Sequence, residues 1–200
     1  MLSRRTPDGR RRARHHSITI AQARDFEEAA RFAALRGHGP TAFVTLNWAH
    51  APSRRLPDSI DRLGAVRECM QKWLYRRRVP VVWLEVREHP RGDCDHAHWL
   101  VYVPRDHFSA FELAAARWVR QHADSFASSA VKVEPIYDLW GVVRYLLKGG
   151  DQEVRERFNC SRFRKPSQGV VYGPRIRVSH SIGKSARQAA AAGGAKALAA

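Results

Sequence analysis

Two strand-type segments joined by a short turn constrain the fold of this chain most strongly. Residues 79–88, VPVVWLEVRE, and residues 96–104, HAHWLVYVP, are rich in β-branched and aromatic residues. The intervening HPRGDCD contains Pro and Gly, which are typical of turns. A turn this short joins antiparallel strands. The two segments therefore predict an antiparallel hairpin, with the histidines of HAH at its mouth.

The rest of the chain alternates helix-type and strand-type segments. Apolar spacing predicts helices at 20–37, 58–78, 106–123 and 138–150, and β-rich runs predict strands at 41–48 and 130–135. After the first helix the order is β–α–β–β–α–β–α. This order predicts an α+β fold with a central antiparallel sheet flanked by helices.

Positive charge is concentrated at the two ends of the 200 residues. The formal net charge is +16, of which residues 1–16 carry +5, residues 17–150 carry +4 and residues 151–200 carry +7. We expect a disordered basic arm at 1–16, one domain at 17–150, and a basic C-terminal extension at 151–200 whose last part is low-complexity. Arg-rich flanks of this kind favour a nucleic-acid partner over a merely solvated tail.

Several other classes of protein are disfavoured by the sequence. The three cysteines form no CxxC pair, so we expect no disulfide framework. The first residues lack the apolar segment of a secretory signal, and no run approaches the roughly 20 apolar residues that span a bilayer. The expectation is a soluble cytoplasmic protein with no membrane partner.

The paired histidines are the first candidate functional group. Side chains alternate along a strand, so His96 and His98 point to the same face. Glu85 and Glu88 lie on the preceding strand, and the hairpin favours Glu88 as the third ligand while leaving Glu85 open. Two imidazoles and a carboxylate fit Mg²⁺ or Mn²⁺, with non-haem iron as the rival ion. Two hydrogen-bonded surface histidines are the simpler alternative.

A tyrosine on the 138–150 helix is the second candidate. Its core stripe is Leu139, Val142, Val143 and Leu146, which leaves Tyr145, Arg144 and Lys148 off that stripe. A phenol is a weak nucleophile and needs nearby positive charge or a metal-polarised electrophile. Lys148 and Arg144 are positioned to supply that charge. Taken alone, Tyr145 is more often a packing residue.

Three motifs resemble the HUH endonuclease superfamily, specifically the Rep-type rolling-circle replication initiators and related transposases. FVTLN at 43–47 resembles the first motif, HAH at 96–98 the His–hydrophobic–His motif, and RYLLKG at 144–149 the single-tyrosine YxxK motif. The resemblance covers roughly residues 41–150. It implies an HUH/Rep-like fold with a ferredoxin- or RRM-like palm.

The resemblance also implies a function. A divalent metal (Mg²⁺ or Mn²⁺) held by His96, His98 and Glu88 would act on single-stranded DNA or a DNA hairpin. Tyr145 would form a 5′-phosphotyrosine link, and Lys148 would stabilise developing charge. A host helicase is an expected further partner. The arginines expected to contact DNA are Arg144, Arg54, Arg55, Arg175 and Arg177.

Three alternatives remain open from the sequence. A transposase would use the same chemistry. A non-catalytic basic DNA-binding protein would use neither metal nor Tyr145. A metal oxygenase with a HxH/Glu ligand set is disfavoured, because such folds are mostly β and two long helices interrupt the strands here.

Overall fold

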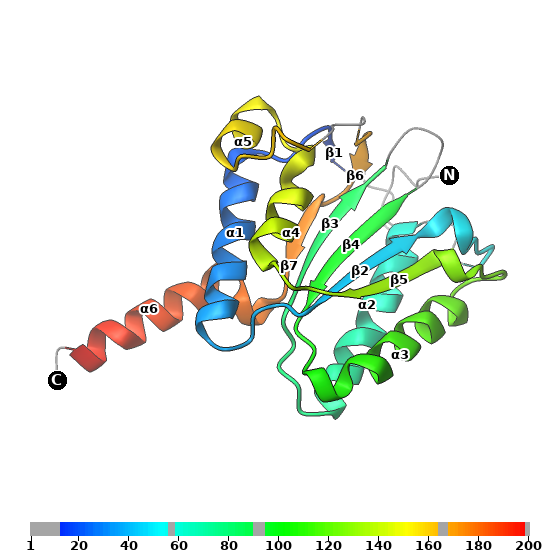
Figure 1. Ribbon diagram of the computed structural model, residues 1–200, viewed down its shortest axis with the longest axis horizontal. Helices are drawn as coiled ribbons and strands as arrows, with labels where there is room; N and C mark the ends of the chain where they lie inside the picture. Colours follow the sequence, from blue (N-terminus) through cyan, green and yellow to red (C-terminus); the bar gives the residue numbers. More distant parts are fainter. Residues whose placement is uncertain (1–12, 56–58, 90–94, 164–167, 199–200) are drawn as a thin grey trace.

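The computed structural model describes residues 13–55, 59–89, 95–163 and 168–198. Its centre is a five-stranded sheet in the order β5-β2-β4-β3-β7, in which every neighbouring pair is antiparallel (Figure 1). The strands are β2 (Ala42–Asn47), β3 (Trp83–Glu88), β4 (His96–Val101), β5 (Val131–Pro135) and β7 (Ile176–Val178). The prediction of an α+β fold with an antiparallel sheet is confirmed.

Helices cover both faces of the sheet. Helices α2 (Ser59–Arg76) and α3 (Phe108–Gln121) pack on one face, while α1 (Ile20–Leu35) and α4 (Leu139–Leu146) pack on the other (Figure 1). Strand alternation divides the core between these two faces. On β4, for example, Trp99 belongs to the α2/α3 cluster and Leu100 to the α1/α4 cluster.

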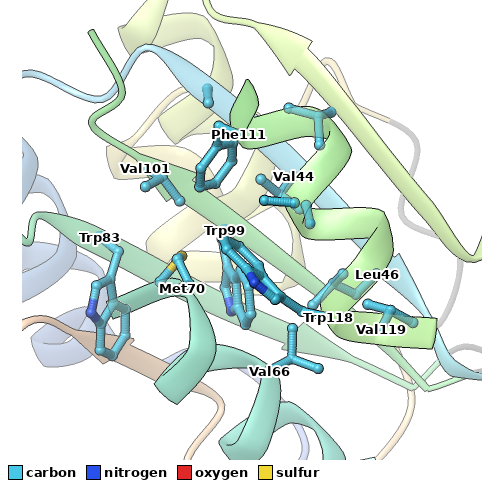
Figure 2. Packing of buried hydrophobic residues seen from close by; sticks show 14 of the residues in the cluster. Val44, Leu46, Val66, Met70, Trp83, Trp99, Val101, Phe111, Trp118 and Val119 are labelled. Atoms are coloured by element: carbon cyan, nitrogen blue, oxygen red, sulfur yellow. The ribbon is translucent and has the colours of Figure 1, made fainter. Parts of the chain in front are cut away.

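The α2/α3 cluster is rich in aromatic residues. Figure 2 shows Trp99 of β4 close to Trp118 and Phe111 of α3, with Met70 of α2 beside it. The Trp73 ring of α2 contacts Phe111 at 5.5 Å and Trp118 at 6.1 Å between centroids, in edge-on arrangements. This packing anchors the side of the sheet that faces away from α4.

Two helix starts have clear local causes. Thr19 and Gln22 form a capping box at the start of α1. Asp138 caps α4 by accepting a hydrogen bond from the Gly141 backbone N–H at 2.9 Å. A Cβ on Gly141 would lie 2.3 Å from an Asp138 carboxylate oxygen, so glycine permits this close approach. Beyond Leu146 the helix tightens into a 3₁₀ turn, Leu147–Gly149.

Described segments among the C-terminal fifty residues pack onto the rest of the fold, in the region where the sequence predicts a basic extension. Helix α5 (Gln152–Arg157) follows α4, β6 (Val171–Tyr172) pairs with β1 (Arg14–His15), and β7 forms an edge of the main sheet. Helix α6 (Lys184–Leu198) projects from the body, where the sequence had predicted a low-complexity tail (Figure 1). Most of the expected basic arm, residues 1–12, lies outside the described residues.

The remaining regular elements are short 3₁₀ turns. They span Trp48–His50, Arg105–His107, Ser128–Ala130 and His180–Ile182. Among the described residues, no helix combines the length and apolarity needed to cross a membrane.

Candidate active site

The histidine pair lies at the start of β4, on the sheet face covered by α1 and α4. In the sheet register His98 lies opposite Thr45 of β2, and His96 lies opposite Asn47 of β2 and Glu88 of β3. His98 is buried and His96 is half-buried, and their rings are 6.4 Å apart between centroids. Both imidazoles therefore share one face, as strand alternation predicted.

Residues of β2 hold the His98 ring on two sides. The Phe43 ring stacks on it at 5.4 Å with an interplanar angle of 18°. The Thr45 hydroxyl lies 3.2 Å from His98 Nδ1. A partner at Nδ1 directs the other ring nitrogen, Nε2, toward the neighbouring strand. That strand carries Glu88.

Glu88 lies at the centre of the site. Its Oε1 accepts a hydrogen bond from Lys148 Nζ at 2.8 Å, and its Oε2 is 3.7 Å from His98 Nε2. Burial raises the pKa of Glu88, but the hydrogen bonds and charges of His98 and Lys148 outweigh it and lower the pKa from its usual 4.5 to about 2. Glu88 is therefore an ionised, almost fully buried carboxylate.

Glu85 is separated from the histidines by the sheet itself. It lies three residues from Glu88 on the same strand, and so on the opposite face. Its Oε2 accepts hydrogen bonds from Arg67 Nη1 at 2.8 Å and Trp99 Nε1 at 2.9 Å. Glu88 rather than Glu85 is the acid that lies beside the histidines.

The side chains of His96, His98 and Glu88 are of the types that bind divalent metals. The distance between two of them also fits a shared ion. Two donors each about 2.1 Å from one ion lie roughly 3 to 4 Å apart, and His98 Nε2 and Glu88 Oε2 have this spacing at 3.7 Å. Within the described residues, however, no three His, Cys, Asp or Glu side chains are already grouped closely enough to hold an ion. The ammonium of Lys148 pairs with the other oxygen of Glu88.

The protonation state of His96 suits metal binding. Burial is the largest cause that lowers its pKa from the usual 6.5, and the charge of His98 adds to it, while Glu88 and Asp95 act in the opposite direction. At neutral pH the imidazole is therefore neutral, which is the form that binds metals.

Tyr145 lies beside Lys148 and is accessible to solvent, with 38% of its surface exposed. The Phe43 ring contacts it edge-on at 6.5 Å and the Phe163 ring at 5.7 Å. Lys148 Nζ lies 3.8 Å from the centroid of the tyrosine ring. Lys148 thus contacts both Glu88 and Tyr145, and it is only 5% exposed.

The predicted DNA-contacting arginines lie in different environments. Arg54 and Arg55 are exposed, and Arg144 and Arg177 are half-buried. Arg175 is fully buried, and its Nη2 donates to the backbone carbonyls of Gly169 at 2.6 Å and His15 at 3.0 Å. Burial lowers the pKa of Arg175 to about 10. The Arg175 guanidinium thus holds backbone of the C-terminal segment inside the fold, and a DNA contact of Arg175 stays a prediction.

Sequence reasoning gave some residues of the site no individual role. Phe43 and Thr45 lie within the FVTLN motif and alternate on β2, and the strand register pairs Thr45 with His98. Phe163 follows α5 in a segment without helical or strand periodicity, so its contact with Tyr145 is a product of tertiary packing. Asp95, next to His96, is buried and accepts hydrogen bonds from Ser59 Oγ and, at 3.4 Å, from Arg87 Nη2.

The chain has a weak structural similarity to a known protein. No protein-family model and no curated protein matches the chain. Among solved structures, the N-terminal nuclease domain of non-structural protein 1 of minute virus of mice is similar at 12% sequence identity and a TM-score of 0.34, over 57% of this chain and 73% of that one. That domain has Zn²⁺ coordination in its active site pocket and recognises DNA at the origin of replication.

Proposed function

We propose that this protein nicks and rejoins single-stranded DNA through a 5′-phosphotyrosine intermediate, as HUH endonucleases of the Rep class do. One observation carries the proposal. A single ammonium, Lys148 Nζ, lies 2.8 Å from Glu88 Oε1 and 3.8 Å from the centre of the Tyr145 ring, and the same carboxylate faces His98. A candidate nucleophile, a cation and candidate metal ligands therefore converge from three separate parts of the sequence.

The proposed ion site consists of His96, His98 and Glu88. When bound there, a divalent ion such as Mg²⁺, Mn²⁺ or Zn²⁺ supplies a Lewis acid for a phosphodiester oxygen. The protein contributes the orientation of the ligands. Phe43 and Thr45 fix the His98 ring, and Lys148 holds one oxygen of Glu88 while the other faces His98.

Tyr145 is the proposed nucleophile. Its phenol oxygen attacks phosphorus as the bond from phosphorus to the 3′ oxygen breaks. The phenol loses its proton, and the departing 3′ oxygen gains one and leaves as a hydroxyl. Lys148, whose Nζ lies 3.8 Å from the centre of the tyrosine ring, is proposed to stabilise the negative charge that develops in the transition state. The phosphotyrosine link retains a phosphodiester bond, so a later 3′-hydroxyl can attack it and reverse the step.

The proposed setting is the initiation of rolling-circle replication on plasmid, phage or nucleoid DNA in the cytoplasm. A host helicase would then separate the strands after the nick. Transposition uses the same strand transfer and differs in the DNA that is recognised.

The proposal is tested by covalent capture of DNA. The full chain is incubated with labelled single-stranded oligonucleotides, both a random pool and hairpins, in Mg²⁺, Mn²⁺ or Zn²⁺, and the products are separated on a denaturing protein gel. We expect a metal-dependent labelled band that Tyr145→Phe and His96→Ala both abolish. Tyr75→Phe is the matched control, because Tyr75 lies on α2 and is 79% exposed.

The outcomes separate the candidate functions. A labelled band that survives Tyr145→Phe would assign the nucleophile to another residue. Salt-sensitive DNA binding without a labelled band for any oligonucleotide or ion would overturn the proposal in favour of a non-catalytic DNA-binding protein.

A further inference from the structure

The segment that follows α5 folds back against the tyrosine helix. The Cys160 backbone N–H donates to the Arg155 carbonyl at 2.8 Å, and its thiol donates to the Arg144 carbonyl at 3.1 Å. The Phe163 N–H then donates to the Cys160 carbonyl at 3.0 Å. Cys160 is fully buried, so this connection between α4, α5 and the returning segment is part of the packed structure.

Three arginines gather around this connection. Burial raises the pKa of the Cys160 thiol, and the charges of Arg144, Arg155 and Arg162 oppose that rise, which means that all three guanidinium groups act on the same sulfur. Within the described segments, none of the three forms an ion pair with an acidic side chain. Three positive charges that act on one buried group and form no ion pair favour the binding of an anion.

Arg155 has unused hydrogen-bonding capacity. Its Nε is buried and has no hydrogen-bond partner among the described residues. Arg155 also lines an open pocket of about 390 Å³ together with Gln152, Glu156 and Ser161. The one acid of this pocket, Glu156, accepts a hydrogen bond from the Gln152 side chain at 2.8 Å. An unsatisfied buried donor beside an open pocket is a feature that a bound ligand would explain.

Phe163 connects the arginine cluster to the proposed nucleophile. Its ring lies edge-on to Tyr145 at 5.7 Å, and the exposed Arg162 guanidinium lies 4.9 Å from the centre of the same ring. Phe163 therefore contacts both Tyr145 and Arg162, one of the three arginines. A DNA strand whose scissile phosphate lies at Tyr145 has its neighbouring phosphates within reach of such a group.

We propose that Arg144, Arg155 and Arg162 form a subsite for a backbone phosphate of single-stranded DNA next to the scissile phosphate. The inference rests on the proposed function and adds two arginines, Arg155 and Arg162, that no motif identified. A guanidinium donates two parallel hydrogen bonds to phosphate oxygens, and arginine suits this role better than lysine. The phosphate also neutralises the mutual repulsion of the three charges. The subsite thereby holds one strand in register with the nucleophile.

The test measures DNA binding apart from catalysis. A fluorescent single-stranded oligonucleotide is titrated with the Tyr145→Phe protein in EDTA at several salt concentrations, so that no strand is cut. Arg162→Gln and Arg155→Gln are each expected to weaken binding about tenfold at low salt. Each is also expected to reduce the slope of log Kd against log salt by about 0.7, the value for one lost single-strand phosphate contact. Arg155→Lys, which keeps the charge, is expected to retain most of the salt slope and to show whether Arg155→Gln acts merely by loosening the fold.

Arg76→Gln serves as the control, because Arg76 is an exposed arginine of α2 on the other side of the sheet. An unchanged affinity and salt slope in Arg155→Gln and Arg162→Gln, or equal losses in Arg76→Gln, would overturn the subsite. In otherwise wild-type protein, Arg162→Gln is expected to raise the KM for the oligonucleotide more than it lowers kcat. A failure of the nickase proposal would instead appear as a missing covalent adduct in wild-type protein, whatever the binding data show.

Discussion

At the scale of single residues, Glu88 is the group on which the candidate site depends. It is a buried carboxylate that contacts a lysine on one oxygen and faces a histidine on the other. Removing one partner of such an arrangement leaves an uncompensated buried charge, which costs several kcal/mol in typical proteins. The same contacts make Glu88 a determinant of both stability and the proposed chemistry.

The pH dependence of stability tests the environment of Glu88. Its pKa is about 2 in the folded protein and 4.5 ordinarily, so the unfolded chain binds the proton more readily. The stabilisation is present above pH 4.5 and is lost as the pH falls from 4.5 to 2. The lost stabilisation is at most about 3–4 kcal/mol, at roughly 1.4 kcal/mol per pH unit.

Urea unfolding in EDTA, followed by tryptophan fluorescence at several pH values, measures this effect. In Glu88→Gln the unfolding free energy is expected to fall less steeply across that window than in wild type. Glu68→Gln is the control, because Glu68 forms only an exposed pair with Lys72 and is expected to change the slope little. Equal slopes in wild type and Glu88→Gln would contradict the prediction.

At the scale of secondary-structure elements, the tyrosine helix is short and depends on its ends. Helix α4 contains eight residues, begins at the Asp138 cap and tightens into a 3₁₀ turn that carries Lys148. Short helices are marginal on their own and are held by packing and by caps. The positions of Tyr145 and Lys148 therefore depend on how α4 begins as well as on its buried residues.

Replacement of the α4 cap should destabilise the protein measurably. Asp138→Ala removes the hydrogen bond to the Gly141 N–H, and we expect a loss of about 1 kcal/mol in the free energy of unfolding. Asp138→Asn keeps an acceptor and is expected to retain most of that stability. Chemical denaturation of both variants distinguishes them, and an Asp138→Asn variant as unstable as Asp138→Ala would argue against a capping role.

At the scale of the whole molecule, the sheet is completed by a distant part of the chain. Strand β7 pairs with β3, the Arg87 N–H donates to the Arg175 carbonyl at 2.8 Å, and the buried Arg87 side chain donates to the Tyr172 carbonyl at 2.8 Å. The strand that ends at Glu88 is thus held between β4 and β7. The C-terminal segment therefore supports the candidate site by pairing with the strand that carries Glu88.

Truncation tests this dependence. A chain of residues 1–150 lacks α5, β6 and β7, and it is expected to lose cooperative thermal unfolding by circular dichroism. Because a domain is stable by only about 5–15 kcal/mol, removal of a sheet strand and its packing is expected to abolish cooperative folding. A chain of residues 1–187 keeps the ion pairs of Arg187 with Asp25 and Glu28, and should unfold cooperatively. Cooperative unfolding of the shorter chain would instead favour a separate extension at 151–200.

The sequence by itself determined the features that depend on local periodicity. Alternation along a strand put His96 and His98 on one face, and helical spacing put Tyr145 outside the core stripe of its helix. The order of strands and helices gave the antiparallel α+β architecture. Such features could be predicted because side-chain direction follows from a repeat of two or of 3.6 residues.

Only the tertiary structure decided which distant residues meet. It decided which of the two glutamates faces the histidines, joined Lys148 to a carboxylate sixty residues away, buried Arg175 and brought Phe163 to Tyr145. These contacts depend on strand register and on how helices pack across the sheet, and periodicity carries no information on either. The sequence of this protein thus specifies the faces of its elements, and the packing of those faces assembles the site.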